Sequence, residues 1–206
     1  MEVSVGRPKA YEREAILLAA RDLFWEQGYE RTSIADLEER TGLNRSSLYG
    51  EFGSKGGLFE AALQCYADRV IANLLADLGR DHTAGLAAIA GLFRRLGEMF
   101  RCDSALWTRG CLMVNTIAEM ASQDQRIRAH AFAYRDRLQT SFGAALARAA
   151  VQGDADSSLV DSRSHLLAAA LIGIWLAVRI DPSHAATSCQ AIAHEVESWR
   201  VHDPGR

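Results

Sequence analysis

Residues 32–59 of the chain read TSIADLEERTGLNRSSLYGEFGSKGGLF and contain two short helical patterns separated by a glycine turn. Ser33 can accept a hydrogen bond from the free backbone N–H groups at a helix start, and Asp36 is its reciprocal partner three residues later. Gly42 would end this first helix, because glycine adopts positive φ without steric cost. Asn44 would then cap the second helix. The stretch therefore predicts a helix-turn-helix.

The second helix of this motif extends from residue 44 to about residue 52, with Leu48 and Phe52 four residues apart on its inner side. The residues left on its outer side are Arg45, Ser46, Ser47, Tyr49 and Gly50. An arginine followed by small hydroxyl residues suits the major groove of DNA, where side chains must reach the base edges. The same pattern occurs in helical hairpins that only pack, so these residues alone leave both interpretations open.

Further motifs lie at fixed spacings before, within and after this stretch. They are Gly6-Arg7-Pro8-Lys9, Gly28-Tyr29, Thr32-Ser33-Ile34, Gly42-Leu43, Leu48-Tyr49, Phe52, Ser54-Lys55 and Leu58-Phe59. Together, over roughly residues 7–63, they resemble the TetR family of transcriptional repressors. The resemblance implies an all-α fold, with an N-terminal three-helix DNA-binding domain and a C-terminal helical domain that binds an inducer and dimerises.

The resemblance also implies a repressor that binds a palindromic double-stranded DNA operator as a homodimer and responds to a small-molecule inducer or an electrophile. The positions that correspond to DNA contacts are Thr32, Ser33, Asn44, Arg45, Ser46, Ser47, Tyr49 and Lys55. Glu38 departs from the family pattern, in which many members have alanine, and so does the pair Gly50-Glu51, where an aromatic residue or His is common. We infer no DNA contact at those positions, and we expect the Glu51 side chain to point away from the phosphates.

The chain has 206 residues, of which 49% are hydrophobic, so it can bury a core in one large or two modest domains. We expect about nine helices and no strands. The first domain would comprise residues 1–55 and the second residues 56–206, with a helix over residues 56–78 linking the two. The tail before them contains Arg7 and Lys9, which could enter an adjacent DNA groove, although a solvated tail is the simpler interpretation.

Charge and motifs exclude several classes of protein. The net charge is −3, and residues 1–60 contain eight Lys or Arg and eleven Asp or Glu, so non-specific DNA affinity should be low. The longest uncharged apolar run, residues 166–178, is shorter than the ~18 residues of a membrane span, and no basic-then-apolar leader opens the chain. We therefore expect a cytoplasmic protein without membrane association. Because cofactor, metal and catalytic motifs are missing from the sequence, the alternative class is a helical ligand-binding or adaptor protein with a non-functional helix-turn-helix, not an enzyme.

The middle helices of the second domain carry aromatic, methionine and polar side chains that could line a ligand pocket. The candidates are Phe100, Trp107, Met113, Asn115, Ile117 and Tyr134. For each of them alone, core packing is the simpler interpretation. Cys111 lies in a Gly-Cys-Leu stretch that resembles a subset of TetR-like regulators, some of which respond to electrophiles. Cys111 would then be a redox-sensing thiol with Cys102 as its resolving partner, whereas the alternative is a small buried thiol.

The last two helices combine apolar and small residues, and residues 166–177 are apolar all round. Such a helix must be covered on two sides. One side would meet its own domain and the other a second subunit, in a two-fold interface. The residues that we predict in this dimer interface are Leu167, Leu171, Ile172, Trp175 and Ile192.

Overall fold

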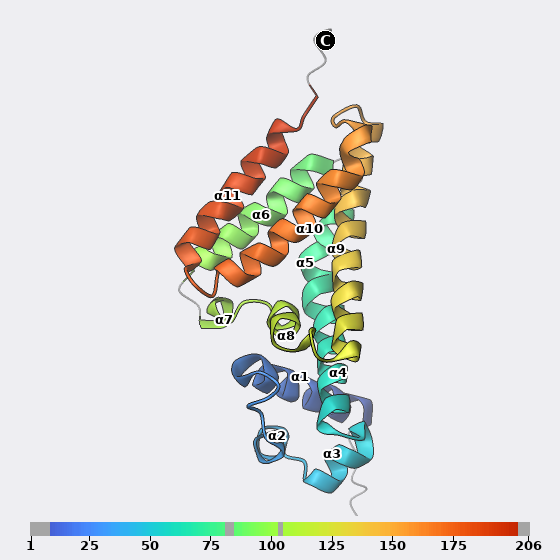
Figure 1. Ribbon diagram of the computed structural model, residues 1–206, viewed down its shortest axis with the longest axis vertical. Helices are drawn as coiled ribbons and strands as arrows, with labels where there is room; N and C mark the ends of the chain where they lie inside the picture. Colours follow the sequence, from blue (N-terminus) through green and yellow to red (C-terminus); the bar gives the residue numbers. More distant parts are fainter. Residues whose placement is uncertain (1–8, 81–84, 103–104, 202–206) are drawn as a thin grey trace, which may run out of the picture. The chain divides into compact units, whose positions relative to one another are not determined.

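The structure is a computed structural model that describes residues 9–80, 85–102 and 105–201. Over these ranges the chain forms helices and turns without a β-strand, which confirms the all-α prediction. The chain divides into two compact units, Met1–Arg69 and Val70–Arg206. Both units are drawn in Figure 1. The predicted groove contact of the N-terminal tail concerns Arg7 and the side chain of Lys9, which lie outside the described residues.

The N-terminal unit contains four helices around a small apolar core. They are α1 (Lys9–Gln27), α2 (Ile34–Thr41), α3 (Arg45–Phe52) and α4 (Lys55–Tyr66). α1 packs along α4, where the rings of Phe24 and Phe59 meet edge to face with centroids 4.8 Å apart. α2 packs on α1 and buries Leu37, while α3 packs on α4 and buries Leu48.

The ends of α2 and α3 are closed by the hydrogen bonds that the sequence predicts. Ser33 Oγ accepts from the Asp36 N–H at 3.1 Å, and the Asp36 carboxylate accepts from the Ser33 N–H at 2.8 Å. Gly42 has a φ of 72° and closes the last turn of α2. The side-chain oxygen of Asn44 accepts from the Ser47 N–H at 2.9 Å. These caps confirm the predicted helix-turn-helix.

A second tight turn joins α3 to α4. Ser54 Oγ accepts from the Gly57 N–H at 3.0 Å and so caps α4. A Cβ atom on Gly57 would lie 2.1 Å from the carbonyl oxygen of Phe52. The start of α4 can therefore approach the end of α3 only because residue 57 is glycine.

Beyond α4 the chain stays helical through the π-helical segment η1 (Ala67–Ile71) and through α5 (Ala72–Arg80). The division between the two units falls inside η1. From the sequence we predict that the first domain ends at residue 55 and that a helix over residues 56–78 links the two domains. The structure groups α4 with α1 to α3, because Leu58, Phe59 and Leu63 of α4 are buried there.

The C-terminal unit is a bundle of longer helices that begins with α5. The others are α6 (Gly85–Arg101), α7 (Ala105–Thr108), α8 (Leu112–Met120), α9 (Gln125–Val151), η2 (Ser157–Leu159), α10 (Val160–Ala177) and α11 (Pro182–Ser198). α6 lies between α11 and α9, and α10 packs along α9 (Figure 1). Because α4, η1 and α5 form one uninterrupted run and α7 is a single turn, the described helices agree with the expected number of about nine.

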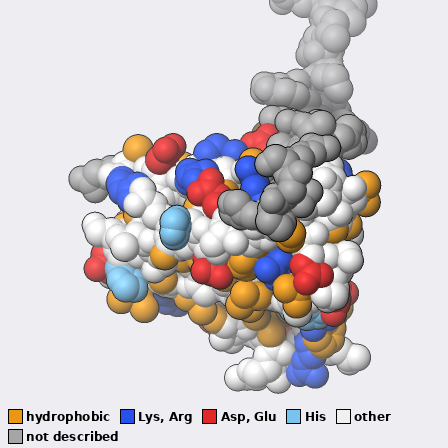
Figure 2. Space-filling view, turned by 90° about the horizontal axis from the view of Figure 1, so that it is seen from above, with side chains coloured by type: hydrophobic (Ala, Val, Ile, Leu, Met, Phe, Trp, Pro, Cys, Tyr) orange, Lys and Arg blue, Asp and Glu red, His pale blue; other side chains and the backbone are white. Residues whose placement is uncertain are grey.

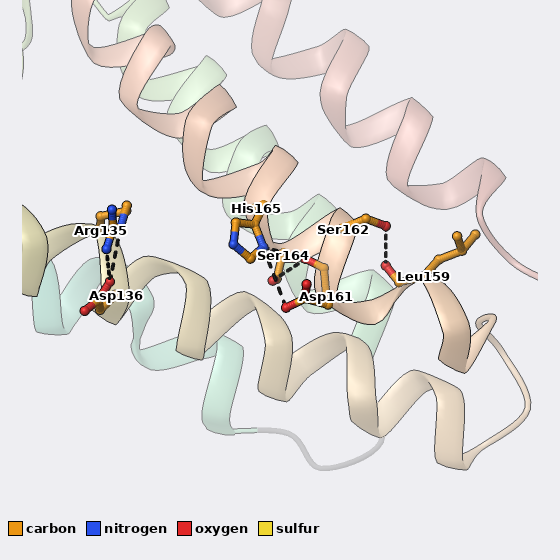
Figure 3. A network of polar contacts seen from close by, with 7 residues as sticks. All are labelled: Arg135, Asp136, Leu159, Asp161, Ser162, Ser164 and His165. Atoms are coloured by element: carbon orange, nitrogen blue, oxygen red, sulfur yellow. Dashed lines mark hydrogen bonds and ion pairs between the residues drawn. The ribbon is translucent and has the colours of Figure 1, made fainter.

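In the first turns of α10, polar side chains contact backbone carbonyl oxygens of the same segment (Figure 3). Ser162 Oγ donates to the carbonyl oxygen of Leu159 at 3.2 Å, and Ser164 Oγ donates to that of Asp161 at 2.7 Å. His165 Nδ1 lies 2.9 Å from the same Asp161 oxygen. These contacts give the polar side chains at the start of α10 hydrogen-bond partners within the same segment.

Residues Ser157–Ala177 have a mean hydropathy of 1.3 and pass a test for membrane spans by length and composition. Leu167, Leu171 and Trp175 of this segment are buried inside the C-terminal unit. One third of the apolar window is buried in the structure, so the test by length and composition is weak evidence for a membrane span.

Charged side chains of both signs are mixed on the surface, as Figure 2 shows for one face. Arg94 of α6 pairs with Glu197 of α11 at 2.5 Å, and Arg95 pairs with Asp77 of α5 at 2.8 Å. All four side chains are at least one-third exposed. Exposed ion pairs of this kind contribute little to stability, so apolar helix packing must hold the unit together.

Two glycines of the N-terminal unit should respond oppositely to alanine. Gly50 has no atom within 4 Å of the place that a Cβ would take, so Gly50→Ala should stabilise the unit by about 0.5–1 kcal/mol. Gly57→Ala should destabilise it by about 1–3 kcal/mol, because the added methyl group would collide with the Phe52 carbonyl. Urea unfolding followed by circular dichroism measures both changes. Shifts of the same sign would contradict the close approach at Gly57.

Candidate DNA-binding interface

The outer side of α3 presents a row of exposed side chains. The row comprises Asn44, Arg45, Ser46, Ser47 and Tyr49. Leu48, on the opposite side of the helix, is fully buried and fixes which face points outward. A helix presented in this way fits the major groove of B-DNA, which is about 12 Å wide.

Arg45 is held at the start of this row. The central carbon of its guanidinium lies 5.4 Å from the centroid of the Tyr49 ring, in a cation–π contact. A guanidinium group can donate two parallel hydrogen bonds to O6 and N7 of a guanine. Tyr49 therefore limits the orientations of the side chain that is best suited to read a base.

Lys55 is the first residue of α4, where the helix N-terminus favours an anion such as a phosphate. Its Nζ lies 4.3 Å from the centre of the Tyr29 ring. The hydrogen bonds with Ser33 hold the pKa of Asp36 below its ordinary value, and the positive charge of Lys55 adds to this effect. An ionised carboxylate thus stays near the lysine that would meet the phosphate.

Thr32 is the predicted contact that the structure does not place at the surface. Its side chain is fully buried, and Oγ1 donates to the carbonyl oxygen of Gly28 at 2.7 Å. The residue therefore stabilises the turn between α1 and α2, and we remove its side chain from the candidate contacts. The DNA contacts of the row on α3, of Ser33 and of Lys55 stay predictions.

Glu38 takes part in this surface in a way that the sequence analysis missed. Its Oε1 accepts from the backbone N–H of Arg45 at 2.5 Å. A carboxylate therefore occupies one of the donors at the start of α3, which could otherwise bind a phosphate. The contact depends on the angle between α2 and α3, and the only sequence signal is an acidic residue seven positions before Arg45.

Glu51 is paired within the unit. Its Oε1 accepts from Arg13 Nε at 2.8 Å, and the Arg13 guanidinium lies over the Phe52 ring at 5.3 Å. From the sequence we expect this carboxylate to point away from the phosphates. In the structure its charge is balanced by an arginine of α1, 38 positions earlier, a pairing that no local sequence pattern indicates.

The residues predicted to line a ligand pocket lie in the C-terminal unit, where several serve as core. Phe100 meets Trp175 edge to face with centroids 5.5 Å apart, and Met113 is buried. Trp107 and Ile117 are half-buried. None of the six candidates lines the groove between α5 and α9 or the groove between α10 and α11.

Asn115 acts as a structural link between two segments. Its side-chain nitrogen donates to the carbonyl oxygen of Arg109 at 2.7 Å, and its oxygen accepts from Arg179 Nη1 at 3.0 Å. Both ends of the amide are therefore used within the unit. The bonds hold the start of α8 near the chain that follows α10.

Cys111 is fully buried, and its Sγ lies 4.0 Å from the hydroxyl oxygen of Tyr134. Burial raises the pKa of Tyr134 well above its ordinary value, with a further contribution from Cys111. A reactive cysteine requires solvent access, so Cys111 could react only after a local opening. Cys102 is exposed. The redox pair stays a prediction.

Most residues of the predicted dimer interface lie inside the C-terminal unit. The buried ones are Leu167, Leu171 and Trp175. Ile172 and Ile192 are half-buried, whereas Leu166 and Leu176 of α10 are 56% and 42% exposed. The structure buries these three residues within their own unit, and their place in a dimer interface stays a prediction. A helix that is apolar all round gives no periodicity from which to choose its outer face.

An apolar groove of about 340 Å³ lies beside the outer face of α10, between α10 and α11. Its lining residues are Leu166, Leu167, Ala170, Ala191, Ile192, Glu195, Val196 and Trp199. The acidic member, Glu195, accepts a hydrogen bond from Trp199 Nε1 at 2.9 Å. We call this groove, together with the exposed leucines of α10, Leu166 and Leu176, the α10–α11 face.

Comparisons with known proteins agree with this geometry. The sequence model described as "Bacterial regulatory proteins, tetR family" matches residues 16–62, which include α2, α3 and most of α4. The HTH-type transcriptional repressor ComR of Escherichia coli (strain K12) is 40% identical over 118 residues. That match covers 57% of this chain and 55% of ComR, so the chain spans about half the length of that relative.

The HTH-type transcriptional repressor BdcR of the same organism is 29% identical over 143 residues, which cover 69% of this chain and 70% of BdcR. Among solved structures, a cysteine mutant of the TetR family transcriptional regulator CifR, complexed with 26bp double-strand operator DNA, has a TM-score of 0.78. It is 26% identical, and the match covers 95% of this chain and 100% of that one. Each of these relatives is a transcriptional regulator. Residues 16–62 thus match the tetR family model, and the described chain has the fold of a TetR family transcriptional regulator.

Proposed function

We propose that this protein is a repressor that binds a palindromic DNA operator as a homodimer and releases it in response to a small molecule. The observation that supports this function best is the exposed N-terminal turn of α3, where Tyr49 orients Arg45 outward. CifR, which shares the fold, was solved with operator DNA.

The roles of the exposed residues follow from their chemistry. Arg45 would read a guanine through its planar fork, while Ser46 and Ser47 would bond base edges or phosphates. Lys55 would hold a phosphate at the start of α4. Because the first 60 residues contain more acidic than basic side chains, these few directed contacts would supply most of the affinity.

Dimerisation would use the α10–α11 face. Its exposed leucines and its groove form an apolar surface that a second copy could cover in a two-fold arrangement. A dimer would place two α3 helices on one side of the DNA, and their spacing must match half-sites about 34–36 Å apart. An inducer can release the DNA only by binding better to an arrangement in which that spacing is lost.

Substitution of the two candidate cations tests DNA binding. Arg45→Ala should cost about 1–3 kcal/mol and relax the sequence preference, because it removes a base contact. Lys55→Ala should weaken binding to all sequences alike, because it removes a phosphate contact. It should also reduce the slope of log K against log salt concentration by about one. Fluorescence anisotropy with the DNA upstream of its own gene, at several salt concentrations, measures both effects.

Arg128→Ala, which removes a charge from α9 in the other unit, serves as the control and should bind like the wild type. If Arg45→Ala and Lys55→Ala also bind like the wild type, the assignment of α3 as the reading helix fails. If the wild type binds no sequence preferentially, the alternative of a ligand-binding or adaptor protein replaces the proposed function.

Glu38→Gln should strengthen DNA binding. The amide keeps an oxygen that can accept from the Arg45 N–H, but it removes a negative charge from the start of α3. The gain should be on the order of 1 kcal/mol at low salt and should shrink as salt screens the charge. Glu39→Gln, on the same helix but without this bond, should have a smaller effect. A loss of affinity in Glu38→Gln would show that the carboxylate itself contacts the operator.

Leu166→Glu should yield monomers and abolish binding to the full palindrome, because it places a charge on the α10–α11 face without disturbing the core. Val151→Glu, at an apolar position that is 89% exposed on α9, is the matched control and should stay dimeric. Light scattering at micromolar concentration measures the molecular mass. A dimer that persists in Leu166→Glu and in Leu176→Glu would place the interface elsewhere.

A further inference from the structure

Arg13 of α1 lies beside the last turn of α3. Its Nε donates a hydrogen bond to Glu51 Oε1 at 2.8 Å, and the central carbon of its guanidinium lies 5.3 Å from the centroid of the Phe52 ring. Glu51 follows Ser47 by four residues, so both side chains lie on one face of α3. The exposed row of α3 therefore continues into an arginine that belongs to another helix.

The ion pair between Arg13 and Glu51 leaves most of the guanidinium unused. The two side chains are 49% and 47% exposed, and a pair in that setting contributes little to stability. A guanidinium has five N–H donors, and among the described residues Glu51 is the one acceptor for Arg13. Because the carboxylate and the ring fix the plane of the group, its two Nη atoms form a fork with a set direction. A second anion can bind to that fork.

Three cations in the described part of the N-terminal unit lie over aromatic rings. Arg45 lies over Tyr49 and Lys55 lies over Tyr29, and both cations are predicted DNA contacts. Arg13 is the third. A ring that restricts a long side chain reduces the conformational entropy that the side chain loses on binding. Arg13 is thus oriented for binding in the same way as the two cations that the sequence assigns to DNA.

We propose that Arg13 is a further DNA contact, which binds a backbone phosphate beside the groove that α3 enters. This inference rests on the proposed function. A helix in the major groove has phosphates along both of its flanks, and such phosphates receive half or more of the hydrogen bonds in protein–DNA complexes. The fork of a guanidinium can donate two parallel hydrogen bonds to one phosphate. None of the DNA contacts that the sequence assigns to the helix-turn-helix lies on α1.

Glu51 is the positioning residue for this contact. An acidic side chain on the outer side of α3 would by itself repel the phosphates. Its carboxylate instead binds the Nε edge of Arg13, which directs the two Nη atoms away from α3. The pair therefore places a donor fork at a position where α3 itself offers only a negative charge.

Arg13→Gln tests the contact. It should weaken binding to the DNA upstream of the gene and to a scrambled duplex of the same length by the same factor, because a phosphate contact carries no sequence information. The slope of log K against log salt concentration should fall by about one. The advantage of the wild type over this variant should therefore shrink about three- to four-fold between about 50 and 200 mM salt. Fluorescence anisotropy measures both quantities.

Two further variants separate a phosphate contact from a purely structural ion pair. Glu51→Gln breaks the same ion pair but keeps the guanidinium, so it should lose no affinity and keep at least the wild-type slope. Arg13→Lys keeps the positive charge, so it should restore the slope that Arg13→Gln loses. If Glu51→Gln weakens DNA binding as much as Arg13→Gln does, the pair acts only through the fold and the proposal is wrong.

Arg69→Gln is the matched control. Arg69 of η1 pairs with Glu14, the neighbour of Arg13 on α1, and these two side chains are 50% and 45% exposed. The exposure and the chemistry of the two pairs thus agree. Arg69 follows Lys55 by fourteen residues of nearly continuous helix, which places it about 20 Å from the start of α4. Arg69→Gln should bind both duplexes with the affinity and the salt slope of the wild type.

The same titrations distinguish failure of this inference from failure of the proposed function. If the wild type prefers the upstream DNA and Arg45→Ala loses that preference, the proposed function holds. If Arg13→Gln then binds with wild-type affinity and slope, the contact at Arg13 is wrong. A wild type that prefers no sequence would overturn both.

Discussion

The hydrogen bonds that close the ends of α2 and α3 are the constraint on which the N-terminal unit depends. α3 has eight residues and buries only Leu48, and a helix of this length is marginal on its own. The turn at Gly42, the cap from Asn44 and the Glu38 carboxylate on the Arg45 N–H set the point at which α3 begins. They also decide which side of the helix faces outward. What α3 can read on DNA follows from that orientation.

Several of these groups already form hydrogen bonds or ring contacts within the protein, which limits the atoms that remain to bind DNA. The Asn44 oxygen is committed to the cap, so its amide nitrogen is the part of the side chain that can donate to DNA. Asp36 stays ionised because its bonds to Ser33 lower its pKa, and its charge repels phosphates. The two cations, Arg45 and Lys55, lie over aromatic rings that restrict their motion. Binding would therefore rely on a few oriented contacts.

The sequence predicts the features that depend on neighbouring residues, such as helix caps. It does not predict contacts between residues far apart in the chain, or which face of a uniformly apolar helix is exposed. The caps at Ser33 and Asn44 are local, so their residue types and spacing predict them. The bond from Glu38 to the start of α3 depends on how two helices cross, which no spacing shows. On α10 nearly every residue is apolar, so a pattern of period 3.6 could not separate Leu167, which is buried, from Leu166, which is exposed.

An acidic DNA-binding unit has a consequence for specificity. Non-specific affinity grows with the number of phosphates that the protein neutralises, and the first 60 residues have more carboxylates than basic groups. A genome offers about 10⁶–10⁹ competing sites, so the ratio of specific to non-specific affinity matters more than the specific affinity alone. Weak non-specific attraction to DNA keeps the ratio of specific to non-specific affinity high, but it leaves a single α3 helix with little binding free energy. A second half-site, bound at the effective concentration that a dimer provides, can restore the affinity. The α10–α11 face would then contribute to operator binding as much as any residue that touches the DNA.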